Sequence, residues 1–257
     1  YSRDEDKQFE MQNRIKDDRL RFFLGDVRDQ TRLEMALNEV DFVIHAAALK
    51  HVPAAEYNPF ESIKTNIYGS QSVVLASIKQ KVKKVLMLST DKACNPINLY
   101  GATKLCSEKI FVNASYLSGI KGTIFGVVRY GNVISSRGSV VPYFKKMIRE
   151  GKKELPLTHR DMTRFFITLP EAIKFVVNCF SILKRGEIFI PKMSSILISD
   201  LIKILNPKAK IKIIGIRPGE KIHETLCSKD ESNYLYENKN YFTIYTPTID
   251  NKKKIGK

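Results

Sequence analysis

The 257-residue sequence has no tryptophan and only four cysteines, which are scattered as Cys94, Cys106, Cys179 and Cys227. Cysteines placed so far apart lack the close pairing of a zinc or redox motif, so we expect a reducing compartment and no metal site. No run approaches the roughly 18 apolar residues that span a bilayer, which argues against a membrane partner. The first residues also lack the basic and then apolar stretch of a signal peptide. These absences favour a cytoplasmic protein.

Charge of one sign dominates what is present. The 43 lysines and arginines outnumber the 27 acidic residues and give a formal net charge of +16. A basic face can supply affinity for nucleic-acid phosphates, but these residues are spread along the whole chain and no nucleic-acid-binding module is recognisable. Because net charge bears on partners and solubility rather than on fold, we expect small anionic ligands and no nucleic-acid partner.

Strand-like and helix-like segments alternate through the first half of the sequence. Short apolar runs predict strands, and apolar residues at near-helical spacing predict the helices between them. Such alternation produces right-handed βαβ units around a parallel sheet. Strands are expected at 20–24, 40–48, 82–90, 122–129, 186–191 and 210–216, and helices at 30–39, 59–81, 100–117, 140–149, 170–183 and 199–205.

The predicted fold class is α/β, with a doubly wound parallel sheet of the Rossmann type and a smaller interwoven lobe. The sequence has no G-x-G-x-x-G segment, so the sheet is expected to lack its first strand and the glycine-rich loop that receives a pyrophosphate. After about Asn132 the alternation breaks. Residues 1–133 and 164–185 are therefore assigned to a dinucleotide-binding domain, 134–163 and 186–250 to the lobe, and 251–257 to a basic tail.

The strongest chemical signal is Tyr100-x-x-x-Lys104, which follows a strand that ends in Ser89-Thr90. Four residues apart at the start of a helix, the tyrosine and the lysine share one face. An ammonium beside a phenol favours the phenolate, which can take a hydroxyl proton while hydride leaves the same carbon. The spacing alone is common by chance, but together with the strand end it predicts a catalytic pair.

Asp91 and Lys92 form the second signal, directly after the same strand. A neighbouring acid and amine are suited to moving two different protons on adjacent carbons. The alternative is an ion pair on an exposed turn, which contributes little to stability. The closeness of Tyr100 and Lys104 in the sequence favours the catalytic interpretation.

A candidate cofactor site lies at the N-terminal end. Ser2 and Arg3 precede a helical stretch, and Asp26 and Val27 follow the next expected strand. If Tyr1 closes the second strand of a dinucleotide fold, these residues face the adenosine ribose. Serine and arginine can hold the 2′-phosphate of NADP, whereas an acidic residue at that place would favour NAD. The expected cofactor is therefore NADP.

Other polar residues allow both structural and functional interpretations. His45 ends an apolar strand, where a buried, hydrogen-bonded histidine is more common than a catalytic one, and Asn66 is expected to bridge to backbone. Arg217 opens a turn that continues to Lys221 and could grip a diphosphate, although a solvated turn is the alternative.

Four segments of the sequence resemble motifs of a known family. They are HAAALKHVPAAEYNP from His45, STDKACNPINLYGATKLCSEK from Ser89, RYGNV from Arg129 and RPGEKIHETL from Arg217. They resemble the extended short-chain dehydrogenases, and specifically the bacterial UDP-N-acetylglucosamine 4,6-dehydratases of the polysaccharide-biosynthesis group. Relatives begin about one βα unit earlier and run further at the C-terminus, so truncation at both ends is expected.

The resemblance implies a role for each catalytic candidate. Tyr100 with Lys104 would deprotonate the C4 hydroxyl as NADP takes the C4 hydride, and Thr90 would align that hydroxyl. Lys92 would remove the C5 proton and Asp91 would protonate the departing C6 hydroxyl, after which hydride returns to C6. The resemblance also implies cofactor contacts from Ser2, Arg3, Asp26, Val27, Ala46, Lys50, Tyr100 and Lys104, and contacts to UDP-N-acetylglucosamine from Lys50, Asn132, Arg217 and Glu220.

Tyr100 also bears on the stereochemical outcome. Membrane-anchored retaining dehydratases and certain epimerases of this family commonly carry methionine at the place of Tyr100. The chain therefore resembles the C5-inverting branch, which serves pseudaminic acid synthesis and whose members form oligomers. A UDP-sugar epimerase, a retaining dehydratase and a non-enzymatic binding protein remain alternatives.

Overall fold

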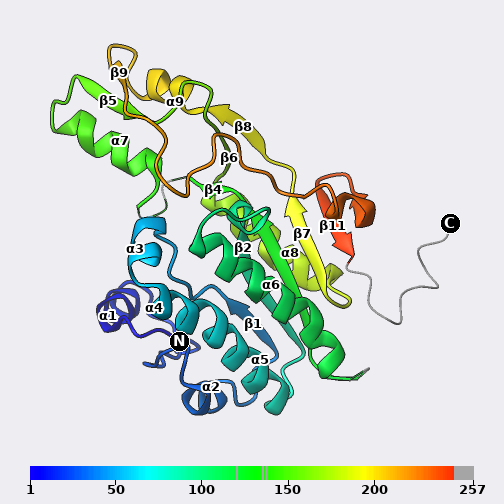
Figure 1. The fold of residues 1–257 in the computed structure, drawn as a ribbon. Coiled ribbons are helices and arrows are strands. Elements are labelled where there is room, and N and C mark those ends of the chain that lie inside the picture. The colour runs from blue at the N-terminus through cyan, green and yellow to red at the C-terminus, as the bar shows by residue number, and fades with distance from the viewer. Residues whose placement is uncertain (120, 135, 137, 246–257) are drawn as a thin grey trace.

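The computed structural model describes residues 1–257 except 120, 135, 137 and 246–257, so the expected basic tail at 251–257 lies outside the described residues. Figure 1 shows a larger body built on a twisted sheet and a smaller lobe that projects from one end of it. Helices cover both faces of the sheet. The predicted α/β class, with a mostly parallel central sheet, is confirmed.

The central sheet has six strands in the order β1-β2-β3-β7-β11-β10. The first four are parallel to one another, and β11 and β10 complete the sheet by antiparallel pairing. The strands are β1 (Phe42–His45), β2 (Lys84–Thr90), β3 (Ile124–Tyr130), β7 (Glu187–Pro191), β10 (Leu235–Glu237) and β11 (Tyr241–Tyr245).

The apolar character of β2 follows from its burial on both faces. Val85 and Met87 are fully buried in a cluster that includes side chains of α5 and α6, whereas Leu86 packs on the other face with side chains of α8. Successive strand residues point to opposite faces, so both sets must be apolar in a covered parallel sheet. The helices of the body are α1 (Glu5–Arg14), α2 (Gln30–Ala36), α3 (Val52–Tyr57), α4 (Pro59–Ile63), α5 (Gly69–Lys79), α6 (Leu99–Leu117) and α8 (Leu169–Ile182), with short 3₁₀ turns at Asp91–Ala93 and Glu231–Tyr234.

The single helix predicted at 59–81 is interrupted, which corrects that expectation. A π-helical turn at Lys64–Tyr68 separates α4 from α5. This turn buries Asn66, whose Oδ1 accepts from the Leu49 N–H at 2.8 Å and whose Nδ2 donates to the Leu49 carbonyl at 3.0 Å. The prediction that Asn66 bridges to backbone is confirmed.

The strand predicted at 20–24 does not form. Only Leu24 is paired, in an isolated parallel bridge to Ser2, with Ser2 N–H donating to the Phe23 carbonyl at 3.1 Å. Two residues after Ser2, Asp4 already caps helix α1 by accepting from the Lys7 N–H. The partner segment turns into a helix too early to extend a ladder, and a strand needs such a ladder to satisfy its backbone groups.

The lobe contains two small sheets and two helices around its own apolar core. Phe144, Leu155 and Ile202 are buried in that core. One sheet has the order β4-β6-β8 and the other pairs β5 with β9. The elements are β4 (Asn132–Val133), α7 (Val140–Arg149), β5 (Glu154–Leu157), β6 (Thr163–Ile167), β8 (Ser194–Leu197), α9 (Ile198–Leu205) and β9 (Lys210–Ile213).

The chain crosses between body and lobe more often than the expected division allowed. Strands β7, β10 and β11 pair in the central sheet, although 186–250 was assigned to the lobe, and β6 belongs to a lobe sheet, although 164–185 was assigned to the body. The reason is that β7 pairs with β3 and so completes the body after the chain has already visited the lobe. Sequence order alone therefore placed this boundary incorrectly.

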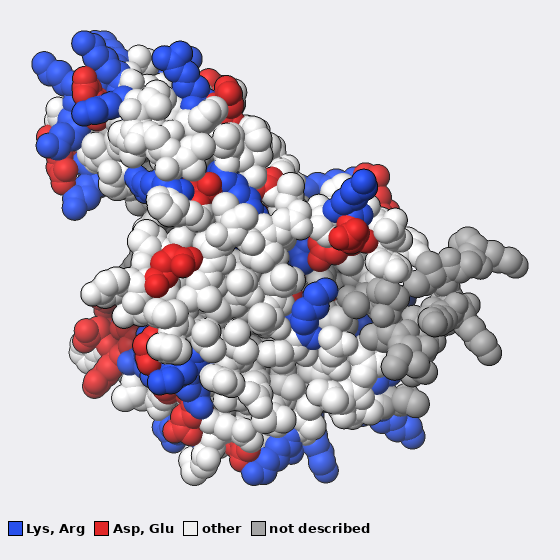
Figure 2. Space-filling view, viewed as in Figure 1, with Lys and Arg blue, Asp and Glu red and all other residues white. Residues whose placement is uncertain are grey.

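Lysine and arginine side chains gather at the outer end of the lobe, as Figure 2 shows. Exposed members of this group are Lys145, Lys146, Arg149, Lys152 and Lys153. In the part of the chain that the structure describes, no helix combines the length and apolar character needed to cross a membrane.

Candidate active site

The carboxyl end of β2 carries a compact polar cluster. The Thr90 hydroxyl donates to Asp91 Oδ1 at 2.9 Å, and Lys92 Nζ donates to the same oxygen at 2.9 Å. The Asp91 side chain is fully buried, and its second oxygen, Oδ2, has no hydrogen-bond partner among the described residues. Lys92 is less enclosed, with 23% of its side chain exposed. A 3₁₀ turn that starts at Asp91 therefore directs the lysine outward while keeping the carboxyl group inside.

Tyr100 and Lys104 lie in the first turns of α6, which begins at Leu99. Burial raises the pKa of Tyr100, a hydrogen bond with Thr90 lowers it, and the nearby Asp91 charge raises it further. Lys104 is buried and its Nζ donates to the Leu88 carbonyl at 2.8 Å. Burial lowers the pKa of Lys104 to about 8, although Glu108 acts in the opposite direction. The tyrosine thus shares the polar cluster with Thr90 and Asp91, and the lysine anchors to the strand beneath it.

Lys92 has a second carboxylate partner that sequence reasoning missed. Its Nζ lies 3.4 Å from Oε1 of Glu224, whose side chain is only 4% exposed. The other Glu224 oxygen lies 3.4 Å from Nζ of Lys221. These residues are separated from Lys92 by about half of the chain, and only their place in RPGEKIHETL could have drawn attention to them.

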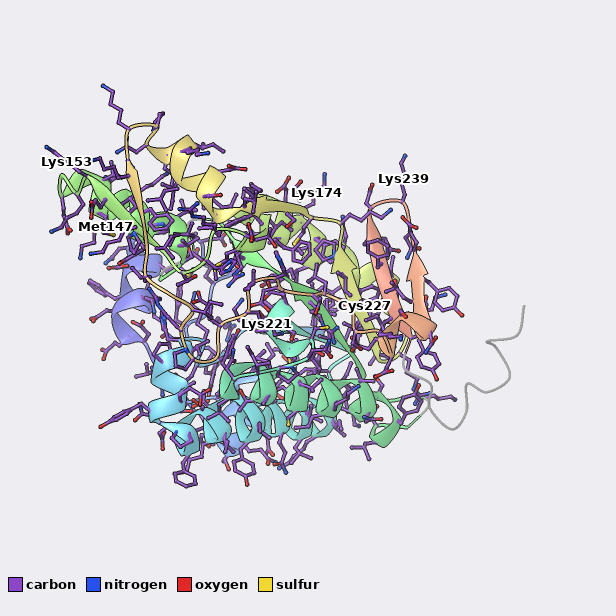
Figure 3. The ribbon with its side chains drawn as sticks, turned by 45° about the horizontal axis from the view of Figure 1, so that its top comes forward. Met147, Lys153, Lys174, Lys221, Cys227 and Lys239 are labelled. Atoms are coloured by element: carbon purple, nitrogen blue, oxygen red, sulfur yellow. The ribbon has the colours of Figure 1, made fainter. Side chains whose placement is uncertain are left out.

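A pocket of about 770 Å³ lies where lobe and body meet. Its lining includes every residue that was predicted to contact the substrate, together with Lys92 and Glu224. Figure 3 places Lys221 where the segment after β9 passes between lobe and body. Thr90, Asp91, Tyr100 and Lys104 do not line the pocket, so Lys92 is the member of the catalytic set that reaches it. The predicted residues in the lining are Lys50, Lys92, Asn132, Arg217 and Glu220.

The turn at 217–220 forms one rim of the pocket and is held from two sides. Asn98 caps α6 by accepting from the Gly101 N–H at 2.8 Å, and its Nδ2 donates to the Gly219 carbonyl at 2.7 Å. Gly219 has a φ of 75°, and an added Cβ would lie 3.0 Å from the Asn98 Cβ. From the lobe, Arg164 Nη2 lies 3.8 Å from Glu220 Oε1. Glycine suits both the backbone conformation and the close approach.

Three of the cofactor residues predicted at the N-terminal end lie together at the surface, where Arg3 is exposed and Ser2 and Asp26 are half-buried. Arg3 Nη1 is 3.5 Å from Asp26 Oδ2, and 58% of the arginine side chain is exposed. Asp26 is also held by Arg28, whose hydrogen bonds lower the pKa of the carboxyl group. Ser2 Oγ accepts from the Asp4 N–H at 3.1 Å. The donor chemistry of a serine hydroxyl and an accessible guanidinium fits a phosphate monoester.

Two other predicted cofactor residues differ in environment. Val27 is buried and packs in the main core beside α5, so only its backbone could meet a ligand. Ala46 follows β1 and is exposed. His45, which precedes it, is buried, and its Nε2 lies 3.1 Å from Ser70 Oγ. Burial lowers the pKa of His45 to about 3, with the Lys104 charge acting in the same direction. The interpretation of His45 as a structural residue is confirmed.

A buried ion cluster behind β2 was not predicted. The fully buried Arg129 donates to Glu108 at 2.6 and 3.0 Å and to Glu231 at 2.8 and 2.9 Å, and it also donates to the Leu226 carbonyl. The Ser89 hydroxyl donates to Glu108 at 2.5 Å. Burial raises the pKa of Glu231, but its bonds to Arg129 outweigh this and lower the value to about 2. The cluster ties α6, β3 and the 226–231 segment to β2, the strand that leads into the predicted catalytic residues.

Comparison with known proteins agrees with this geometry. The family model described as polysaccharide biosynthesis protein matches residues 1–246. The chain belongs to this family. A crystal structure of Pen from Bacillus thuringiensis matches this family member with a TM-score of 0.91 and 41% identity, covering 96% of this chain and 78% of the other.

Two curated relatives carry the names of activities. A protein of Campylobacter jejuni serotype O:2 named UDP-N-acetylglucosamine 4,6-dehydratase (inverting) is 59% identical over 249 residues, which cover 97% of this chain and 74% of the relative. A protein of Rickettsia canadensis named UDP-glucose 4-epimerase is 41% identical over 248 residues, covering 95% of this chain and 72% of the relative. This family member is thus more similar to the former.

Proposed function

We propose that this protein catalyses the 4,6-dehydration of UDP-N-acetylglucosamine with inversion at C5. The observation that carries the proposal is the Asp91–Lys92 pair, in which a buried carboxyl group and a partly exposed amine share one hydrogen bond at the edge of the pocket. An elimination needs one group to take the C5 proton and another to protonate the departing oxygen at C6. The 59% identity to a relative named for this reaction supports the same conclusion.

Oxidation at C4 is assigned to the cluster around Tyr100. Thr90 would align the C4 hydroxyl and Tyr100 would take its proton as hydride leaves the carbon. Burial raises the pKa of Tyr100, so the phenolate depends on its hydrogen bond with Thr90 and on positive charge nearby. Lys104 lies one helical turn after Tyr100 and is the cationic side chain nearest to it in the sequence.

Elimination is assigned to Lys92 and Asp91. The resulting C4 ketone acidifies the C5 proton, which Lys92, in its free-amine form, would remove. Asp91, in its acid form, would protonate the departing C6 hydroxyl, and its unpartnered Oδ2 is free to carry that proton. Water therefore leaves across C5 and C6 with both protons supplied or taken by side chains of one strand end.

We assign the cofactor as NADP. A bound nicotinamide would accept the C4 hydride and return it at C6, so the overall reaction needs no external reductant. Ser2 and Arg3 fit the 2′-phosphate, because they offer a hydroxyl and an accessible guanidinium. Asp26, Val27 and Ala46 would lie along the adenosine side, and Lys50, Tyr100 and Lys104 on the nicotinamide side.

The substrate would occupy the pocket between lobe and body. Lys50, Asn132, Arg217 and Glu220 line it, and Arg217 can pair with a diphosphate. We accordingly assign dinucleotide binding to the body and sugar-nucleotide binding to the lobe. We further propose that the enzyme acts as a homo-oligomer in the cytoplasm, in pseudaminic acid synthesis.

Product analysis with full-length enzyme, NADP and UDP-N-acetylglucosamine tests the proposal. We expect a product lighter than the substrate by one water, with deuterium at C5 when the reaction runs in deuterated water. NMR couplings sampled early should show the L-arabino configuration of the 4-keto-6-deoxy sugar. A D-xylo product would reject inversion alone, whereas a product of unchanged mass would reject dehydration and favour the epimerase activity for which the Rickettsia relative is named.

A further inference from the structure

Lys92 is held between two carboxylates rather than one. Its Nζ lies 2.9 Å from Asp91 Oδ1 on its own strand end and 3.4 Å from Glu224 Oε1 on the segment that follows the pocket rim. Both carboxylates are almost fully buried. One oxygen of each, Asp91 Oδ2 and Glu224 Oε2, has no hydrogen-bond partner among the described residues. Buried carboxylates with unsatisfied oxygens are costly, which points to a functional reason for keeping two of them beside one amine.

The backbone on both sides of Glu224 is fixed independently of Lys92. On one side, the Arg164 guanidinium donates to the Lys221 and Ile222 carbonyls at 2.9 Å each. On the other side, the Leu226 carbonyl accepts from Arg129 at 2.8 Å. Because these contacts come from the lobe and from the body respectively, Glu224 is delivered to Lys92 by a segment anchored at both ends. The backbone that carries Glu224 is therefore held by contacts other than the ion pair with Lys92.

Lys221 completes the arrangement. Its Nζ donates to the Cys94 carbonyl at 2.7 Å and lies 3.4 Å from Glu224 Oε2, an ion-pair distance without hydrogen-bond geometry. Lys221 thus connects the rim segment to the turn after Asp91 and balances the charge of Glu224. Besides Lys92 and Glu224, the charged or titratable residues that line the pocket are Lys50, His51, Tyr143, Lys146, Arg164, Arg217 and Glu220.

We propose that Glu224 is a positioning residue for C5 deprotonation, holding the Lys92 amine toward the pocket and strengthening it as a base. The proposal rests on the dehydratase function stated above. When Lys92 takes the C5 proton it becomes an ammonium, and an anion 3.4 Å away stabilises that product. Removing the anion lowers the basicity of the amine, and a weaker base takes the proton more slowly.

The first test measures Lys92 directly and needs no turnover. Lysines of the full-length protein are ¹³C-dimethylated, the Lys92 signal is assigned from its loss in Lys92→Arg, and its pKa is read from an NMR titration. We expect Glu224→Gln to lower the pKa of Lys92 by about one unit, because one neighbouring negative charge is lost. Glu224→Asp, which keeps the charge, should retain most of the wild-type value. An unchanged pKa in Glu224→Gln would overturn the proposal.

The second test follows turnover across pH. Glu224→Gln should lower the plateau kcat about tenfold, leave KM for UDP-N-acetylglucosamine within about threefold, and move the rising limb of the profile to lower pH. The matched control is Glu237→Gln, which makes the same change in an exposed ion pair between Glu237, at the end of β10, and Lys192, and should behave as wild type. A plateau and limb equal to those of wild type would overturn the proposal.

Should Glu224→Gln fail to fold, Glu224→Asp decides. It should lower kcat while leaving the limb in place, and an unchanged kcat would contradict the role of Glu224. If wild-type enzyme removes no water from UDP-N-acetylglucosamine, the dehydratase proposal fails by itself. The NMR titration still decides whether Glu224 controls Lys92.

Discussion

The two ends of the proposed site are built in different ways. At the catalytic end, Thr90, Asp91 and Lys104 are buried. Thr90 ends a seven-residue strand, Asp91 begins the 3₁₀ turn that follows it, and Lys104 lies on a nineteen-residue helix. At the adenosine end, Ser2 is half-buried and is held by an isolated bridge and by hydrogen bonds to its hydroxyl and carbonyl oxygens, and Arg3 forms a 3.5 Å ion pair on the surface. Chemistry that depends on the placement of single protons is assigned to the first, and recognition of a charged ligand to the second.

The difference teaches where precision is supplied. A side chain is placed accurately only when its own surroundings fix its rotamer, which burial and second-layer hydrogen bonds do at the catalytic end. Attraction between a guanidinium and a phosphate tolerates small displacements, because it depends on charge over several ångströms. Substitutions at the two ends should therefore differ in what they damage, and four experiments can test this contrast.

The largest effect is expected from Lys92→Ala in full-length enzyme. Dehydration should fall about a thousandfold, since a positioned base is lost, while C4 oxidation can still proceed. Stopped-flow absorbance should show reduced cofactor accumulating without a dehydrated product. Lys83→Ala, an exposed lysine paired with Asp41 at the other end of β2, serves as the control. If cofactor reduction disappears as well, Lys92 has a binding or folding role and the proposed order of steps is wrong.

Next in size is the loss of stability expected from Glu108→Gln. This change leaves the buried Arg129 with only Glu231 as an anionic partner, and breaking a buried pair in this way costs about 3 kcal/mol. Urea unfolding measures the free energy of unfolding. Glu61→Gln alters exposed ion pairs with Arg28 and Lys64 and should change it by less than about 1 kcal/mol. Equal effects for both variants would show that the buried cluster does not stabilise the catalytic end.

At the other end, Arg3→Ala should raise the Kd for NADP about tenfold and leave that for NAD unchanged, because only NADP has a 2′-phosphate. Calorimetry measures both constants, and the melting temperature should stay constant because Arg3 is mostly exposed. Arg19→Ala, in an exposed pair with Asp17, is the matched control. A parallel loss of affinity for both dinucleotides would place Arg3 elsewhere on the ligand.

The smallest effect concerns pH and sharpens the contrast in burial. Burial lowers the pKa of Lys104 to about 8, so in the folded state the ammonium is penalised below that pH. Between about pH 8 and the ordinary lysine value near 10.4, the unfolded chain binds more protons, and stability therefore rises with pH. From pH 7 to pH 9, wild type should gain about 1 kcal/mol relative to Lys104→Met in chemical unfolding. An identical pH dependence for the two proteins would contradict this penalty.

Regular elements of the body were predictable from the sequence because a covered parallel sheet demands apolar residues on both faces. The strand expected at 82–90 is observed as Lys84–Thr90, and the helix expected at 100–117 is observed as Leu99–Leu117. The segment at 20–24 had the same apolar character but lacked a partner long enough to form a ladder. Leu20 and Leu24 are also exposed, so in this segment apolar character predicted neither pairing nor burial.

The candidate site was predictable only as far as each signal was local. Tyr100 and Lys104 lie on one helix, and Asp91 and Lys92 follow one strand. Their short spacing in the sequence therefore indicated both pairs as catalytic candidates. Glu224 reaches Lys92 across 132 positions of the chain, and no local pattern distinguishes it from a glutamate on a solvated turn. Pairings of that kind are products of the fold and become visible only with it.

The amide of Asn98 belongs to two structures at once. Its oxygen begins the helix that carries Tyr100, and its nitrogen grips the turn at Gly219 on the rim of the pocket. If ordering of the turn favours ordering of the start of the helix through this side chain, thermodynamic reciprocity requires the helix to favour the turn by the same free energy. A diphosphate bound by Arg217 would then favour the ordered position of Tyr100 before the sugar reacts. Under the proposed function, Asn98 would thus link substrate binding at the turn to oxidation at Tyr100.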